Sequence, residues 1–183
     1  MNFRKKNIVA KLLILVSVTL VIVSCSTKKN NFVNRKYHNT TAKYNGYFNG
    51  NESLKAGIKK LEENHKDDFS EIIPVFKTGD LAKNQTIHPY MNKAIEKGSI
   101  VIQRHSMNIR GKEHNKWIDD NYFMIGKSYF YKGEFDEAIK TFNYIKETYK
   151  RNPLKYDAAL WLARCFSEKE DYIAAEMELD QLQ

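Results

Sequence analysis

The sequence predicts an all-α fold, an array of antiparallel helix pairs of the α-solenoid kind. Apolar residues recur with the 3.6-residue period of helices, and alternating strand patterns are absent. One set of residue types also occurs twice with a constant offset of 37 positions, which is typical of a helical repeat array. The five pairs are Gly126 and Ala163, Tyr129 and Phe166, Phe135 and Tyr172, Ala138 and Ala175, and Phe142 and Leu179. In each copy the small residues would let two helices approach closely, while the large ones fill the space between them.

The first copy resembles the tetratricopeptide repeat, whose first helix carries W-x2-L-G-x2-Y and whose second carries A-x3-F. The matching residues are Ile125, Gly126, Tyr129, Ala138 and Phe142, with Tyr122 in place of the tryptophan. The offset exceeds the family's usual period by three residues, which we place in the loop 150–153. The resemblance covers residues 122–179. It implies that the first helix of each pair lines a concave groove for protein partners.

Residues 1–24 have the pattern of a secretory signal peptide. Four cations, Arg4, Lys5, Lys6 and Lys11, precede or enter the apolar run 12–23. This run is shorter than the roughly 20 residues that a bilayer-spanning helix needs. Removal of this segment would lower the formal net charge of +8 to +4, which weakens a nucleic-acid interpretation of the basic composition.

The signal peptide ends in Ile-Val-Ser-Cys25, which resembles the lipobox of bacterial lipoproteins. The resemblance implies cleavage before Cys25, attachment of diacylglycerol to its thiol, and acylation of the new amino group, with palmitate as a typical chain. Two or more acyl chains give a stable membrane anchor. An ordinary signal peptide followed by an incidental cysteine is the alternative. The other cysteine, Cys165, lies among apolar residues and is interpreted as a small buried thiol.

Residues 25–33 are predicted to form the lipidated cysteine and a short extended tether, which includes the polar stretch 26–31. Residues 34–112 are predicted to form a degenerate helical hairpin, a long loop over 64–88, and a further helix. The hairpin turn is placed at Asn49-Gly50-Asn51 because such residues favour turns. Its first helix would bury a stripe of Val33, Tyr37, Tyr44 and Phe48. The predicted helices are 34–48, 52–65 and 89–106, followed in the repeat region 113–183 by 115–132, 135–149, 154–168 and 171–182.

The N-terminal part of the mature chain is similar to the SprE/PorW family of gliding-motility and type IX secretion lipoproteins. The resemblance rests on Cys25-Ser-Thr-Lys-Lys, on Phe32-Val-Asn-Arg35, on His38, and on the run from Thr41 to Asn51 with Leu54 and Gly57. It is strongest from Cys25 to about Leu61. It implies a lipoprotein with tetratricopeptide repeats at the periplasmic side of the secretion machine. Members of this family are considerably longer, so we expect the chain to be the front end of a larger protein.

Motifs for catalysis or cofactors are absent from the sequence. No phosphate-binding loop, dinucleotide fingerprint or H-E-x-x-H occurs. A metal site at His65, Asp67, Asp68 and Glu71 is disfavoured because these residues would not share one helix face. Glu134, Asp136 and Glu137 are interpreted as acids that stabilise a helix start. We therefore expect no enzyme activity, cofactor or metal in this chain.

The register of the two copies predicts the residues of a partner-binding groove. On the first helix of each pair, these residues lie on a face rotated by about 100° from the stripe that carries the small and aromatic repeat residues. The first copy would present Phe123, Lys127 and Phe130, and the second would present Leu160, Arg164 and Ser167. Lys127 and Arg164 would then stack, flanked by apolar residues, and suit a partner segment with a carboxylate and an apolar anchor. The alternative is that both cations only solvate an exposed face.

The sequence therefore predicts a lipid-anchored repeat scaffold that binds protein partners of the secretion and motility machinery. By analogy with lipoprotein sorting, Ser26 lacks the aspartate that marks inner-membrane retention, and the next three residues lack the acids that mark surface export. The expected location is the periplasmic face of the outer membrane. The alternative is an envelope enzyme or a chaperone for exported substrates, whose active part lies beyond Gln183.

Overall fold

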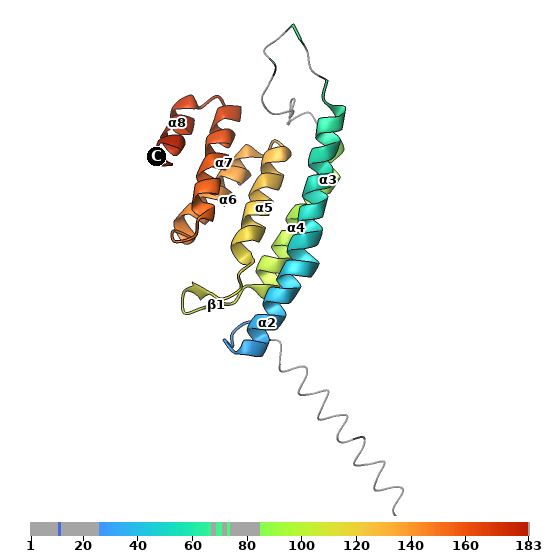
Figure 1. Cartoon of the computed structure of the whole chain (residues 1–183), viewed down its shortest axis with the longest axis vertical. Coiled ribbons are helices and arrows are strands. Elements are labelled where there is room, and N and C mark those ends of the chain that lie inside the picture. Colours follow the sequence, from blue (N-terminus) through green and yellow to red (C-terminus); the bar gives the residue numbers. More distant parts are fainter. Residues whose placement is uncertain (1–10, 12–25, 67–68, 71–72, 74–84, 183) are drawn as a thin grey trace, which may run out of the picture.

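The fold is an all-α array in which each helix packs on the next one in the chain (Figure 1). The computed structural model describes residues 11, 26–66, 69–70, 73 and 85–182. The elements are α2 (Phe32–Thr41), the π-helix η1 (Ala42–Tyr47), α3 (Phe48–Asn64), the 3₁₀ turn η2 (Gln85–Ile87), α4 (His88–His105), β1 (Asn108–Ile109), β2 (Lys112–Glu113), α5 (Ile118–Tyr131), α6 (Phe135–Thr148), α7 (Leu154–Glu168) and α8 (Tyr172–Asp180). Pairs α3/α4, α5/α6 and α7/α8 follow one another, and α5 contacts both α3 and α7.

The predicted hairpin turn at Asn49-Gly50-Asn51 is wrong. Helix α2, the π-helix and α3 run without interruption from Phe32 to Asn64, so the predicted helices 34–48 and 52–65 are one long helix. Asn31 caps its start by accepting a hydrogen bond from the Asn34 amide at 2.8 Å. The true antiparallel partner of α3 is α4.

The glycines of this long helix serve close packing rather than a turn. A Cβ atom on Gly46 would lie 1.8 Å from Val101 Cγ2 of α4, and one on Gly57 would lie 2.5 Å from the Met91 methyl group. On Gly50 it would meet Met124 of α5 at 2.6 Å. The Gly46 position excludes a side chain because the valine opposite is stiff, whereas at Gly50 and Gly57 the nearest atoms belong to methionine ends that can shift. The three glycines allow the long helix to pack closely against α4 and α5.

The predicted apolar stripe of the first helix is also wrong. Its members lie on the solvent side, with Val33 61%, Tyr37 45%, Tyr44 57% and Phe48 56% exposed. The buried face repeats every four residues instead, through Asn34, His38, Ala42, Gly46, Gly50 and Leu54. In a regular α-helix each step of four residues drifts by about 40°. The π-helix accommodates one extra residue and so reduces the drift across these five steps.

The stretch after position 25 is a turn held against α2, not an extended tether. The Asn34 side-chain amide donates to the carbonyl oxygens of Ser26 at 2.7 Å and Lys29 at 3.2 Å. Arg35 donates to the Asn30 side chain at 2.7 Å. The buried Asn34 thus connects Ser26 and Lys29 directly to the first helix.

A short β-hairpin, which the sequence reasoning missed, joins α4 to α5. Asn108 pairs with Glu113 and Ile109 with Lys112, around Arg110 and Gly111, which both have positive φ. The Glu113 carboxylate accepts hydrogen bonds from the Ser106 hydroxyl and from the amides of Met107, His114 and Asn115, at 2.5 to 2.9 Å. The predicted helix 115–132 therefore begins only at Ile118.

The two predicted repeats form α5/α6 and α7/α8, and the bounds of α7 are those predicted. Ala138 and Phe142 of α6 are fully buried, and Phe142 packs against Gly126 as the register requires. In the second copy the small residues Ala163 and Ala175 are buried as well, but Tyr172 and Leu179, the equivalents of Phe135 and Phe142, are 65% and 43% exposed. The repeated sequence pattern therefore predicts the burial of the small residues in both copies, but not the exposure of these two large residues in the second.

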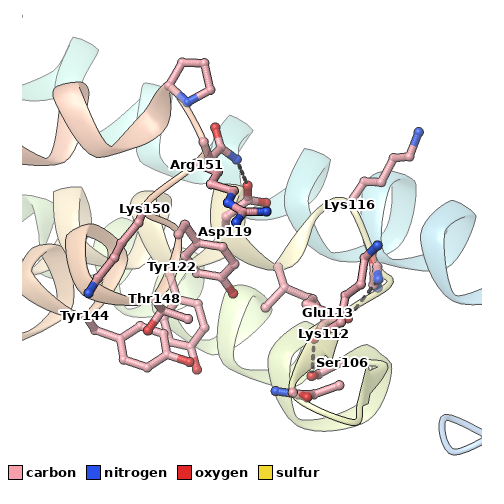
Figure 2. A pocket seen from close by; sticks show the side chains of 17 residues that line it. Ser106, Lys112, Glu113, Lys116, Asp119, Tyr122, Tyr144, Thr148, Lys150 and Arg151 are labelled. Atoms are coloured by element: carbon pink, nitrogen blue, oxygen red, sulfur yellow. Dashed lines mark hydrogen bonds between the residues drawn. The ribbon is translucent and has the colours of Figure 1, made fainter.

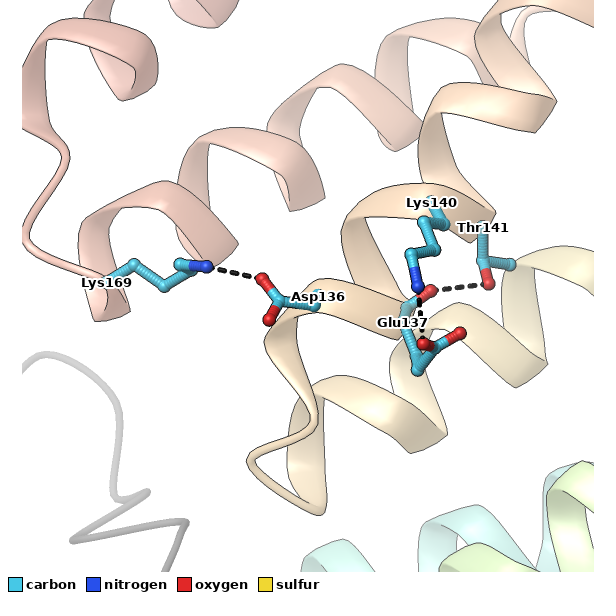
Figure 3. A network of polar contacts seen from close by, with 5 residues as sticks. All are labelled: Asp136, Glu137, Lys140, Thr141 and Lys169. Carbon is cyan, nitrogen blue, oxygen red and sulfur yellow. Dashed lines mark hydrogen bonds and ion pairs between the residues drawn. The ribbon is translucent and has the colours of Figure 1, made fainter.

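Polar contacts connect the two repeats at their outer edge. Lys169, at the end of α7, forms an ion pair with Asp136 in the first turn of α6 (Figure 3). Glu137 accepts from Lys140 at 2.7 Å within α6, and its backbone carbonyl accepts from the Thr141 hydroxyl. Asp136 and Glu137 lie in the first turn of α6, where the sequence places them, and both form ion pairs with lysines. Among the described residues, no helix has the length and apolar character that a membrane span requires.

Candidate partner-binding surface

Trp161 of α7 forms the centre of an aromatic cluster between the two repeats. Its ring stacks on Phe142 of α6 at 6.0 Å, and meets Phe130 and Tyr131 of α5 edge-on at 5.2 and 5.9 Å. Phe123 lies edge-on at 6.3 Å. Packing of these large rings fixes the position of α7 relative to α5, so the side chains on the two helices also keep fixed positions relative to each other.

Two cations lie over this cluster. Arg164 Cζ is 4.2 Å from the ring centroid of Trp161, and Lys127 Nζ is 5.2 Å from the same centroid. Arg164 also lies 4.9 Å from the Phe130 ring, and Lys127 lies 5.8 Å from the Phe123 ring. Both cations are therefore placed by cation–π contacts with the same aromatic cluster.

The two positive charges influence each other. Burial, and then the charge of Arg164, lower the pKa of Lys127, while Asp157 acts in the opposite direction. Burial raises the pKa of Tyr131, and Arg164 opposes this shift by its charge and by a hydrogen bond. Because two like charges share a partly desolvated surface, an anion placed between them would be stabilised by both.

Five of the six predicted groove residues are accessible, and one is not. Lys127, Arg164 and Phe123 are partly exposed, and Leu160 and Ser167 are exposed, with 46% exposure for Leu160. Phe130 is fully buried, so its assignment to the groove surface is wrong. It lies beneath Arg164, whose Cζ atom is 4.9 Å from its ring centroid.

Sequence reasoning missed Trp161. Its place in the repeat is that of Met124, which is buried, and nothing in the five matched pairs marks it. The signal that could have identified it is its spacing from Arg164, because residues three apart on a helix are neighbours. We use the name cationic aromatic surface for Phe123, Lys127, Leu160, Trp161 and Arg164.

A second feature is a pocket of about 770 Å³ beside the β-hairpin (Figure 2). It is lined by the hairpin, the start of α5, the end of α6 and the loop before α7. Three tyrosines contribute to its wall, Tyr122, Tyr144 and Tyr149. The Tyr122 ring lies 4.6 Å from that of Tyr144, and Asp119 accepts a hydrogen bond from the Asn152 side chain.

Burial dominates the electrostatics of this pocket. It raises the pKa of Tyr122 to about 12, with added contributions from Tyr144 and Glu113. It also raises the pKa of Asp119, against two backbone hydrogen bonds. A tyrosine with so high a pKa donates a hydrogen bond at neutral pH and does not act as a base. The pocket can therefore hold a polar group, to which Tyr122 would donate a hydrogen bond.

Two histidines meet where α2 packs on α4. His38 Nδ1 and His105 Nδ1 are 2.9 Å apart, and Asn115 donates to both backbone carbonyl oxygens. Burial lowers the pKa of His105, helped by His38. In the described ranges, no group of three or more histidine, cysteine or acidic side chains could hold a metal ion.

The predicted lipidation site, Cys25, lies outside the described residues. So do three of the four residues of the disfavoured metal site, namely Asp67, Asp68 and Glu71. Most of the predicted loop 64–88 does so as well. No protein-family model matches the chain, and a comparison with curated proteins finds no significant similarity.

Proposed function

We propose that this protein is a lipid-anchored scaffold at the periplasmic face of the outer membrane that binds other proteins through the cationic aromatic surface. The observation that carries the proposal is the pair of cations, Lys127 and Arg164, over the single ring of Trp161. They occupy equivalent positions in the two copies of the repeat, 37 residues apart. The resemblance to SprE/PorW lipoproteins makes components of the type IX secretion and gliding machinery the proposed partners.

The proposed ligand is a protein segment with a carboxylate and an apolar side chain. A carboxylate between Lys127 and Arg164 would accept charge-assisted hydrogen bonds, which are roughly twice as strong as neutral ones. An apolar side chain would pack beside Leu160, which is 46% exposed. Large aromatic residues and arginine are also the residue types that dominate binding energies at protein interfaces.

The test is a double charge reversal, Lys127→Glu with Arg164→Glu, in the anchored protein. Partner recovery after mild detergent extraction, measured by quantitative mass spectrometry, should fall at least tenfold because an acidic partner is now repelled. The matched control reverses Lys55 and Lys59 on the exposed side of α3, which should leave recovery unchanged. Full recovery with an unchanged melting temperature in the double mutant would exclude this surface as the binding site.

An envelope enzyme or a substrate chaperone is the second candidate. The pocket beside the β-hairpin is the feature that favours it, because a cavity of about 770 Å³ is of the size that small ligands use. Binding of a small molecule there would be detected by saturation-transfer NMR and abolished by Tyr122→Leu.

A further inference from the structure

A groove at the start of the long helix is both basic and aromatic. Phe32, Lys36, Lys43 and Tyr44 line it from α2 and the π-helix, and Lys116 and Trp117 line it from the segment before α5. We call these six residues the basic aromatic groove, and its volume is about 460 Å³. Lys43 Nζ lies 5.0 Å from the Trp117 ring and 5.1 Å from the Tyr44 ring.

The charge around this groove is one-sided. From Ser26 to Asn51 the chain contains five lysines and arginines and no aspartate or glutamate. No carboxylate lines the groove either, where Arg35 adds a fourth cation to Lys36, Lys43 and Lys116. Such a surface attracts an extended anionic partner and is not neutralised by its own lining.

Apolar side chains extend from the same end of the helix. Phe32 is 73% exposed and Val33 is 61% exposed, next to the cations of the groove. Phenylalanine beside lysine and arginine is typical of helices that lie in the interface of a bilayer with anionic lipids. Tryptophan and tyrosine, represented here by Trp117 and Tyr44, are also enriched at the level of lipid headgroups.

The position of the chain start identifies the occupant. Asn34 holds Ser26 and Lys29 against α2, so residue 25 lies one peptide unit from a turn packed on this helix. We propose that the basic aromatic groove docks onto the surface of an anionic phospholipid bilayer. Lys36, Lys43 and Lys116 would contact lipid phosphates, and Phe32 and Val33 would enter the headgroup region. This orientation rests on the lipid anchor of the proposed function, since that anchor brings residue 25 to the membrane.

The experiment uses the full, processed and acylated chain on vesicles with 30% phosphatidylglycerol and doxyl-labelled lipids. A single fluorescent probe is attached at Tyr44→Cys, or at Ile173→Cys in α8 as the matched control. Ile173 is 76% exposed, and the native Cys165 is buried. Position 44 lies in the groove and is 19 residues from Cys25. A lipid anchor at Cys25 would therefore not by itself bring a probe at position 44 to the bilayer.

The expected result is quenching of the Tyr44 probe at least threefold stronger than that of the Ile173 probe. The double substitution Lys36→Glu and Lys43→Glu should reduce quenching of the Tyr44 probe to that of the Ile173 probe, while the protein still floats with the vesicles. Flotation with equal, weak quenching at both sites would overturn the docking and leave the anchor intact. A chain that does not float would overturn the anchor and this orientation together. If the vesicles did not quench the Tyr44 probe but its fluorescence changed on addition of poly-glutamate, the groove would be assigned to an acidic protein partner instead of the bilayer.

Discussion

The ring of Phe142 fills the space that Gly126 leaves by having no side chain. A Cβ atom on Gly126 would lie 2.7 Å from Phe142 Cε1 and 2.8 Å from Cζ. The ring cannot move away freely, because Phe142 is fully buried and stacks on Trp161. Helices α5 and α6 therefore pack at a distance that this pair sets.

We expect substitution of either residue to destabilise the array. Phe142→Ala should lower the free energy of unfolding by about 3–5 kcal/mol, because it leaves a cavity at the centre of the first repeat. Gly126→Ala should cost about 1–3 kcal/mol through overpacking. Denaturant unfolding of Gly126→Ala, of Phe142→Leu and of the variant with both substitutions gives the coupling energy, since a smaller side chain makes room for the new methyl group. Additive effects, or ready tolerance of Gly126→Leu, would contradict the packing.

A pH dependence of stability is expected from Asp120 in the first turn of α5. Burial and the charge of Asp119 raise the pKa of Asp120 from 3.8 to about 6. Because the folded state holds the proton more tightly, the resulting stability is present below pH 4 and is lost as the pH rises through about 6.

Asp120→Asn should remove this loss. The whole shift corresponds to about 3 kcal/mol, and solvent screening of the partly exposed side chain reduces the expected effect to about 1 kcal/mol. The variant should equal the wild type near pH 4 and exceed it at pH 7 in urea unfolding. Asp136→Asn is the control of opposite sign, because a hydrogen bond and the charge of Lys169 lower the pKa of Asp136. If the free energies of unfolding of Asp120→Asn and the wild type differed by the same amount at every pH, this effect would be excluded for Asp120.

The thiol of Cys165 should not react in the folded protein. Burial raises its pKa to about 12, and the side chain is inaccessible. At pH 8 a chromogenic disulfide reagent should modify it only after unfolding, with a rate that rises with denaturant. Complete modification within minutes in native buffer would show that α7 opens readily.

Lipidation is tested directly at Cys25. The Cys25→Ala variant should accumulate as an unprocessed precursor and should not incorporate labelled palmitate in cells. Cys165→Ala is the control and should be processed and labelled as the wild type. Equal labelling of the Cys25→Ala variant would exclude the lipid anchor.

The repeat region could be predicted from the sequence because its spacing and its packing agree. Gly126 and Phe142 indicated a close contact between two helices, and α7 spans Leu154–Glu168 as expected. Within such pairs, contacts are local in sequence, so the period of the pattern already reflects the structure.

The first helix could not be predicted in the same way, because its buried face is made of small and polar residues. Asn34 and His38 are 2% exposed, and their burial is stabilised by hydrogen bonds to segments before α2 and on α4. A hydrophobicity pattern gives such residues no weight and favours the exposed aromatic residues instead. The glycines at 46 and 50 have the same sequence signal whether they end a helix or allow close packing.

The candidate surface was predicted in part for a related reason. Lys127 and Arg164 followed from the 37-residue register, which applies to equivalent positions in both copies. Trp161 and the burial of Phe130 did not follow, because they depend on how α7 lies against α5 and not on either helix alone.

The turn held by Asn34 has a mechanical consequence. A free linker of six residues would span about 12–15 Å and let the array tumble about its attachment point. With Ser26 and Lys29 hydrogen-bonded to α2, that freedom is removed. Load applied to α8 would pass through the packed helices to Ser26 without first stretching a slack connection. The array would then behave as a bracket, which transmits torque as well as tension to its N-terminal turn.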